Sequence, residues 1–260
     1  MRYYFPIAVA VISLLAACSK SNDDKTTPQP PAGDDVKTGV YVISNMAADT
    51  SATSAVNATT IYYSLEQNKI VPASLAQTSS WDVAFTGIYN SSIAVNNGKA
   101  PNSPGFGGPG QGGLYLYRND GVEAASFDNN TFKPLSIPID QNLFNTSFNA
   151  VKSVTISDAD FVANDFIGID HFMGTGYGYA YYDFYGAFFP NDKKKAHIVY
   201  TLPRTIIVKT AKGKYAKLQI TSVYKNSPQS PSRDDKTGYL SFRFAIQMDG
   251  TKNLDIAVNR

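Results

Sequence analysis

An alternating run of residues near the C-terminus places the strongest restriction on the fold. Residues 238–248 read GYLSFRFAIQM. Apolar side chains at every second position alternate there with smaller or polar ones: Leu240, Phe242, Phe244, Ile246 and Met248 against Ser241, Arg243, Ala245 and Gln247. A period of two residues is typical of a strand with one buried face. The run therefore predicts a half-buried strand in a sheet.

Other segments extend this interpretation along the chain. Residues 204–210 (RTIIVKT) and 214–224 (KYAKLQITSVY) flank a short AKG sequence, which predicts a hairpin turn at residues 211–213. Further strands are expected at residues 40–44, 59–65, 80–89, 113–118 and 151–157. Only residues 158–168 have a helical character, and no repeat recurs at a fixed period. The chain is expected to be all-β.

The N-terminus has the organisation of a secretory signal. Arg2 precedes a mostly apolar stretch that ends in small residues and Cys18. The stretch is shorter than the roughly 20 residues that span a bilayer. The residues LAAC before and at Cys18 resemble the lipobox of bacterial lipoproteins, in which the cysteine is lipidated; a plain signal peptide is the alternative. Lipidation of Cys18 would anchor the chain to the membrane without a spanning helix.

The chain divides into three parts on this interpretation. Residues 1–17 form the signal peptide, residues 18–39 the lipidated cysteine and a disordered tether, and residues 40–260 a single β domain. The tether is rich in Ser, Asp, Lys, Pro and Gly, so it has little apolar surface to bury. Asp23 and Asp24 resemble the export signal of surface-displayed lipoproteins, or belong simply to a solvated linker. The expected location is the outer membrane, at the cell surface.

Composition and motifs exclude several functions. Without Arg2 the chain has 22 basic and 21 acidic residues, which gives no reason to expect a nucleic-acid partner. Cys18 is the only cysteine, so the mature chain has no intramolecular disulfide. The glycine-rich residues 97–113 contain a GxGxxG spacing without a following helix, so we interpret them as a long mobile loop, a lip over a pocket. GxSxG and HExxH are absent, so no enzyme is expected.

Two segments resemble the HmuY family of haem-binding bacterial lipoproteins. They are residues 79–98, SSWDVAFTGIYNSSIAVNNG, with Trp81, Asp82, Ala84 and Phe85, and residues 197–224, with GYLSFRF after them. The order and spacing fit across about residues 60–248. The resemblance implies a two-sheet antiparallel domain with long loops and at most one or two short helices. It also implies no catalysis, and capture of haem for a dedicated outer-membrane receptor.

The residues of these two segments also have a structural interpretation that needs no ligand. The only tryptophan, Trp81, is expected to anchor the core, while Asp82 caps a neighbouring turn or pairs with a cation. Four basic residues on or beside strands are expected on solvated faces: Arg204, Lys209, Lys214 and Lys217.

The stretch GIDHFMGTGYGYAYYDFY, residues 168–185, holds the candidate ligand site. Haem iron takes axial ligands from His, Met, Cys or Tyr inside an aromatic wall. His171 and Met173 supply two of these types, and a haem-capturing family member has a His-x-Met near the equivalent place. The wall candidates are Phe172, Tyr181 and Tyr182. A structural histidine and a core methionine are the alternative interpretation.

The second axial ligand is open. Where haem-binding relatives have a histidine, this chain has Tyr185, Gly186 and Ala187, so the resemblance does not imply ligation by two histidines. Ligation by a single histidine, by His with Met, by His197, or by a tyrosinate from Tyr181, Tyr182 or Tyr185 stays open. Two functions follow. The first is a surface lipoprotein that binds haem or a related porphyrin for uptake; the second is a non-haem module on the same fold that binds a glycan, a peptide or an envelope protein through its tyrosine-rich face.

Overall fold

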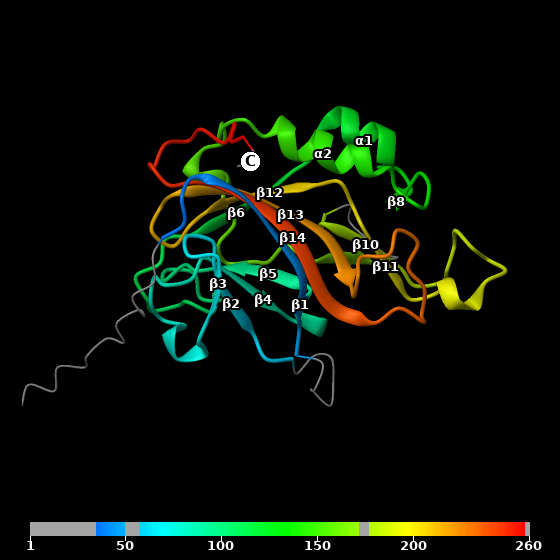
Figure 1. Cartoon of the computed structure of the whole chain (residues 1–260), viewed down its shortest axis with the longest axis horizontal. Coiled ribbons are helices and arrows are strands. Elements are labelled where there is room, and N and C mark those ends of the chain that lie inside the picture. Colours follow the sequence, from blue (N-terminus) through cyan, green and yellow to red (C-terminus); the bar gives the residue numbers. More distant parts are fainter. Residues whose placement is uncertain (1–34, 50–57, 172–176, 258–260) are drawn as a thin grey trace, which may run out of the picture.

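The computed structural model describes residues 35–49, 58–171 and 177–257, and of residues 170 and 171 it describes the backbone only (Figure 1). The signal peptide, Cys18, most of the tether, Phe172 and Met173 lie outside the described residues. Within them, no helix is long and apolar enough to cross a membrane. The fold is mainly β with several antiparallel sheets and two short α-helices, so the expected fold class is confirmed.

Four sheets form the described part of the chain. The largest has the strand order β1 (Gly39–Ala47), β14 (Thr237–Gln247), β13 (Tyr215–Tyr224), β12 (Thr205–Lys209) and β6 (Gly113–Tyr117). The second has the order β3 (Lys69–Val71), β2 (Ile61–Ser64), β4 (Val83–Thr86) and β5 (Ser92–Val95). The third comprises β11 (Ile198–Thr201), β10 (Ala180–Asp183) and β9 (Ile169–His171), and β7 (Phe127–Asp128) pairs with β8 (Lys133–Pro134). All pairs are antiparallel except β9 with β10.

The main core lies between the five-stranded and four-stranded sheets. Phe242 and Phe244 of β14 pack there against Tyr63 and Phe85 of the second sheet, with ring centroids 5.3–6.5 Å apart. Such aromatic pairs bury large apolar areas and hold two sheets face to face. This packing explains the apolar half of the alternating pattern in β14.

The polar half of that pattern is also buried, contrary to the expected half-exposed strand. The helices α1 (Asp120–Ser126) and α2 (Gln141–Ala150) cover the other face of β12–β14 (Figure 1). Ser241 and Gln247 are almost fully buried, and Arg243 donates hydrogen bonds to the Phe144 carbonyl of α2 and to Gln219. Of these three residues, Arg243 is the one that α2 contacts. Ser241 is hydrogen-bonded to Asn45 and Ser227, and Gln247 to Thr38 and Asn253. These long-range contacts have no signal in the alternation.

Two predicted elements are wrong. Residues 151–157 make only an isolated bridge, Ser153 with Asn253, and residues 158–168 contain a single 3₁₀ turn, Asp158–Asp160, where a helix was expected. The second segment instead runs along the edge of β6, where Val162 pairs with Leu114. Asn119 and Asp140 precede the two α-helices, and their side chains cap them by accepting from the N–H groups of Val122 and Asn142.

The glycine-rich loop is compact, and residues 97–113 do not line the large cavity described below. It folds back on itself, with the Gly98 N–H donating to Gly110 O at 2.8 Å and the Gly107 N–H to Gly98 O at 2.9 Å. A β-carbon on Gly98 would lie 1.7 Å from the Gly108 carbonyl oxygen. Only glycine permits this close approach, so the glycines serve backbone packing beside Asn96 and Trp81.

Candidate functional site

The Trp81–Asp82 segment is structural. Trp81 is completely buried, and its indole N–H donates to the Ala76 carbonyl at 2.8 Å. The Asp82 carboxylate accepts from the N–H groups of Leu65, at 2.7 Å, and Ala211, at 3.1 Å. Asp82 therefore ties the turn after β2 to the β12–β13 hairpin turn, which confirms its predicted capping role. Burial, and then the charge of Glu66, raise its pKa to about 6.

The four basic residues expected on solvated faces divide into two kinds. Lys209 pairs with Asp158 at 2.8 Å and Lys214 with Glu66 at 3.1 Å. Arg204 is fully buried, and Lys217 is 2% exposed with its amine donating to the Val151 carbonyl. The prediction is therefore wrong for Arg204 and Lys217, because packing of the helices on β12 and β13 closes over them.

An exposed imidazole stands at the end of the three-stranded sheet. His197 precedes β11, and its Nδ1 lies 2.8 Å from the Tyr182 hydroxyl oxygen. The backbone N–H of His197 donates to the Asp183 carbonyl at 2.8 Å, and its φ of 64° places His197 in the left-handed region. The backbone and one ring nitrogen are thus fixed while the side chain stays exposed. This is how a protein orients a histidine for a ligand.

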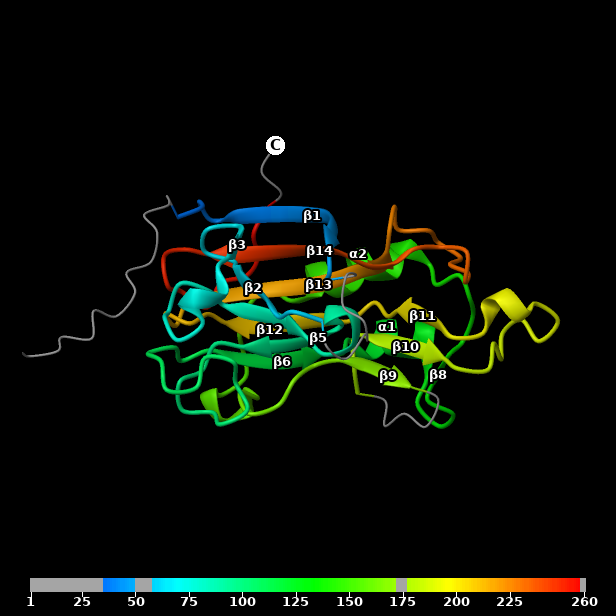
Figure 2. The same cartoon turned by 90° about the horizontal axis from the view of Figure 1, so that it is seen from below.

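Aromatic rings surround this imidazole. The Phe184 ring lies 4.5 Å from the His197 ring and 4.9 Å from the ring of Tyr185, which is 70% exposed. The Asp183 carboxylate accepts from the Ala187 N–H at 3.0 Å and so fixes the turn that carries Tyr185. We call Tyr182, Phe184, Tyr185 and His197 the histidine cluster. The connection between β10 and β11 projects beyond the strand ends (Figure 2).

The other sequence candidates have different positions. Tyr181 is 2% exposed and packs in the main core against Phe188, on the opposite face of β10 from Tyr182. His171 ends β9, and its backbone pairs with Tyr182 across the parallel strands. Phe172 and Met173 lie outside the described residues, as does the His171 side chain. Both histidines of the chain therefore neighbour Tyr182, one through its ring and one through its backbone.

Charge near the cluster is mixed, and Arg233 contributes a positive charge that acts on Tyr182. Lys194 is paired with Asp234 at 2.6 Å. Lys193 and Arg233 are exposed and make no ion pair or side-chain hydrogen bond within the described ranges. Partial burial raises the pKa of Tyr182, and the positive charge of Arg233 partly offsets this effect. An anionic ligand would therefore meet favourable charge beside Tyr182.

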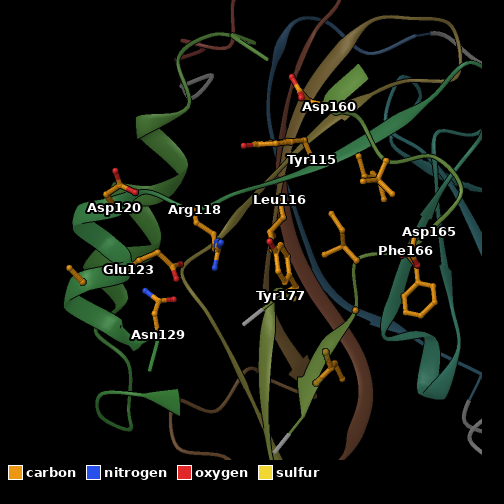
Figure 3. Close-up of a pocket in the computed structure, with 17 residues that line it drawn as sticks. Tyr115, Leu116, Arg118, Asp120, Glu123, Asn129, Asp160, Asp165, Phe166 and Tyr177 are labelled. Carbon is orange, nitrogen blue, oxygen red and sulfur yellow. The ribbon is translucent and has the colours of Figure 1, made fainter. Parts of the chain in front are cut away.

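A large cavity lies elsewhere, between α1, β6 and the chain that leads into β9. Its volume is about 1080 Å³ (Figure 3). Leu116, Phe166 and Tyr177 supply apolar and aromatic lining, and the Arg118 guanidinium lies 5.1 Å from the centre of the Tyr177 ring. The wall also includes four carboxylates, Asp120, Glu123, Asp160 and Asp165. The sequence candidates His197, Tyr181, Tyr182 and Tyr185 are not part of this wall.

Two features of the site are not predicted from the sequence. Phe184 is not among the candidate haem-pocket residues, although the sequence YYDFY, residues 181–185, places aromatic residues at four of its five positions. The cavity gave no local signal, because its wall is assembled from segments as distant as residues 114 and 178. Among the described residues, no group of three or more His, Cys, Asp or Glu side chains is arranged to hold a metal ion.

Comparison with known proteins identifies the family. Residues 57–244 match the family model described as HmuY protein. No curated protein matches the chain. A solved structure from Bacteroides fragilis, described as a lipoprotein, is 12% identical, with a TM-score of 0.35 and coverage of 81% of this chain and 92% of its own. One from Bacteroides vulgatus, described as an HmuY-like heme binding protein, is 10% identical, with a TM-score of 0.36 and coverage of 82% and 97%.

These two structural similarities are too weak to assign a ligand. The family match does not depend on them, and it spans well over half of the 260 residues. The chain therefore belongs to the HmuY family.

Proposed function

We propose that this protein binds haem or a related porphyrin at the histidine cluster and delivers it for uptake. The observation that carries the proposal is that both histidines of the chain neighbour Tyr182. Membership of the HmuY family supports the same ligand class. The proposed role is binding rather than catalysis.

His197 is the best-prepared axial ligand among the described residues. When Nδ1 carries the proton, it donates to the Tyr182 hydroxyl oxygen, which leaves the Nε2 lone pair for iron. A hydrogen bond of this kind, made by the ring nitrogen that does not bind the metal, fixes the tautomer and the ring orientation of a metal-binding histidine. No hydrogen bond to Nε2 is present within the described part of the chain.

The surroundings of His197 suit a flat, anionic ligand. Phe184 and the exposed Tyr185 offer ring faces and edges against which a porphyrin can pack. The propionates of haem are negatively charged at neutral pH, so Arg233 favours their approach. The cavity beside α1 is the weaker candidate for haem, because its wall carries three exposed aspartates against one guanidinium, that of Arg118.

The second axial ligand comes, on this proposal, from the stretch that begins at His171. His171 and Met173 are the candidates there, and Phe172 is a further wall candidate. The backbone of His171 already lies beside Tyr182. Tyr185 is the alternative ligand on the described side of the site, where its side chain is largely exposed.

The cellular role is part of the same proposal. Lipidation of Cys18 would hold the domain at the outer membrane, and the tether would let it reach an outer-membrane haem receptor. Membrane attachment then needs only the lipid anchor. A receptor partner is expected because a lipid-anchored protein has no route of its own for moving haem across the membrane.

The test is a titration of the purified protein with hemin, followed by absorbance. We expect a shifted and sharpened Soret band, since axial ligation fixes the spin state of the iron. His197→Ala should weaken binding and change the band. His171→Ala is the matched variant, because it removes the only other imidazole from the adjacent strand.

The outcomes separate the ligand sets. Loss of hemin binding with either substitution supports ligation by two histidines. Loss of hemin binding with His197→Ala alone supports ligation by His197 with Met173, or by a single histidine. A high-spin spectrum unaffected by either substitution assigns the iron to Tyr185. If micromolar hemin leaves the Soret band of the wild-type mixture unchanged, haem is not the ligand, and the glycan, peptide or envelope-protein alternative takes its place.

A further inference from the structure

The strand β6 forms an edge of the five-stranded sheet that is only partly covered. On its outer side, Leu114 and Val162 exchange two backbone hydrogen bonds, each 2.8 Å long. Backbone groups of alternate residues in a strand point to the same side, so the N–H and C=O of Leu116 also point outward. In the part of the chain that the structure describes, neither group of Leu116 has a hydrogen-bond partner.

The chain opposite Leu116 leaves the edge for a definite reason. Continued antiparallel pairing from Val162 would place Asp160 opposite Leu116. Residues Asp158–Asp160 instead form a 3₁₀ turn, in which the Asp160 carboxylate accepts from the N–H and hydroxyl of Ser157. Because of this turn, backbone pairing on the outer side of β6 ends after the Leu114–Val162 pair. The outer edge of β6 is therefore unpaired at Leu116 among the described residues.

The large cavity described above opens at this unpaired edge. Leu116, Val162 and Ile169 line it with aliphatic side chains. Three of its wall residues expose large apolar area, Val162 at 44%, Phe166 at 60% and Tyr177 at 67%. An unpaired strand edge beside exposed apolar side chains can bind an extended peptide, because the edge pairs its backbone and the apolar side chains contact alternate residues.

The charge of the cavity indicates what such a peptide would carry. Both oxygens of Glu123 are bound by Arg204, so this carboxylate is already neutralised. Asp120, Asp160 and Asp165 are exposed around the cavity, and Figure 3 shows Asp120 and Asp165 on opposite sides of Leu116. Arg118 is the one cation in the wall. Three carboxylates against one guanidinium favour a positively charged ligand.

We propose that the outer edge of β6 binds an extended basic peptide segment as an added strand, with apolar side chains alternating with lysine or arginine. The backbone of the segment pairs with Leu116, its apolar residues pack on Phe166 and Tyr177, and its cations face the three aspartates. This site is separate from the histidine cluster, so it stands whether or not the protein binds haem.

The probe is the hexapeptide acetyl-VKVKVK-amide, titrated into the purified protein and followed by calorimetry. We expect saturable binding at one site. An analogue N-methylated at its three valines lacks the backbone N–H donors on one edge of the peptide strand. It should bind about tenfold more weakly. Acetyl-VEVEVE-amide should not bind, because its charges repel the aspartates. Hydrogen exchange at the Leu116 amide should slow when the first peptide is bound.

Variants of the protein locate the site. Leu116→Pro removes the outward N–H and is compatible with an edge strand, so it should lower the affinity about tenfold. Asp165→Lys should lower it about threefold, whereas Asp249→Lys, which reverses an exposed charge outside the cavity wall, should not. Equal binding of the N-methylated peptide, or an unchanged exchange rate at Leu116, overturns the proposal even if Leu116→Pro fails to fold.

Discussion

Arg204 and Glu123 form a two-bond ion pair inside the protein. Arg204 Nε donates to Glu123 Oε1 and Nη2 to Oε2, both at 2.8 Å, and the two side chains are 0% and 8% exposed. The same guanidinium donates to the Gly178 carbonyl and lies over the Phe127 ring. One residue thus joins α1 to the start of β12 and to the chain that enters β10.

Breaking this pair should destabilise the fold strongly. Glu123→Ala leaves a buried guanidinium without its counter-ion, and we expect the free energy of unfolding to fall by about 3–5 kcal/mol in urea denaturation. Asp234→Ala breaks the exposed pair with Lys194 and should cause no measurable change. The double variant Glu123→Leu with Arg204→Met should recover most of the loss. A weak effect of Glu123→Ala would contradict the structural role.

Asp82 should make stability fall as the pH rises. Its pKa is raised from 3.8 to about 6 by burial and by Glu66, so between these values the native protein holds a proton that the unfolded chain has released. Stability therefore decreases with pH across this window. Two pKa units correspond to about 3 kcal/mol. Urea denaturation measures the free energy of unfolding of the wild type and of Asp82→Asn at pH 4 and at pH 7. The wild-type value minus the Asp82→Asn value should be smaller at pH 7 than at pH 4 by about that amount.

An exposed carboxylate supplies the control of opposite sign. The Asn130 N–H and the Thr131 hydroxyl lower the pKa of Asp128. The native carboxylate then loses its charge at a lower pH than the unfolded one, so its contribution is lost as the pH falls. The free energy of unfolding of the wild type minus that of Asp128→Asn should therefore increase as the pH rises. A parallel trend for both variants would rule out the assignment for Asp82.

The Tyr182 hydroxyl should matter for haem binding only through His197. Tyr182→Phe keeps the ring and removes the hydrogen bond to Nδ1. Loss of the hydrogen-bond partner of a metal-binding histidine typically costs about 10-fold or more in metal affinity, and hemin titration should show this weakening with an altered Soret band. Tyr185→Phe is the matched variant: it should leave the spectrum unchanged when His197 is the ligand and abolish it when tyrosinate is.

Cys18 should be the only attachment to the membrane. Cys18→Ala removes the sulfur that would carry the acyl chains, so the folded protein should be recovered in the soluble fraction. Fractionation of cells after a salt wash measures this directly, with the wild-type chain as reference. Persistence of the variant in the membrane fraction would exclude the lipid anchor as the attachment.

Much of the sheet structure was predictable from the sequence. The strand β14 and the AKG turn between β12 and β13 both occur where they are predicted, because strand propensity and turn chemistry are properties of neighbouring residues. The predicted core role of Trp81 and capping role of Asp82 are also confirmed, since a large apolar ring favours burial and a carboxylate accepts from backbone N–H groups of turns.

Tertiary structure alone decided what surrounds these elements. Burial of Arg204 and Lys217 depends on α1 and α2 closing over the far face of the sheet, which no local pattern near either residue reveals. The same holds for the meeting of His197 with Tyr182, 15 residues apart, and for the open edge at Leu116. The sequence by itself determined the strands of the five-stranded sheet and the turn between β12 and β13, since these follow from local periodicity and turn residues. The neighbours of each strand, and hence both candidate binding sites, were decided by long-range packing.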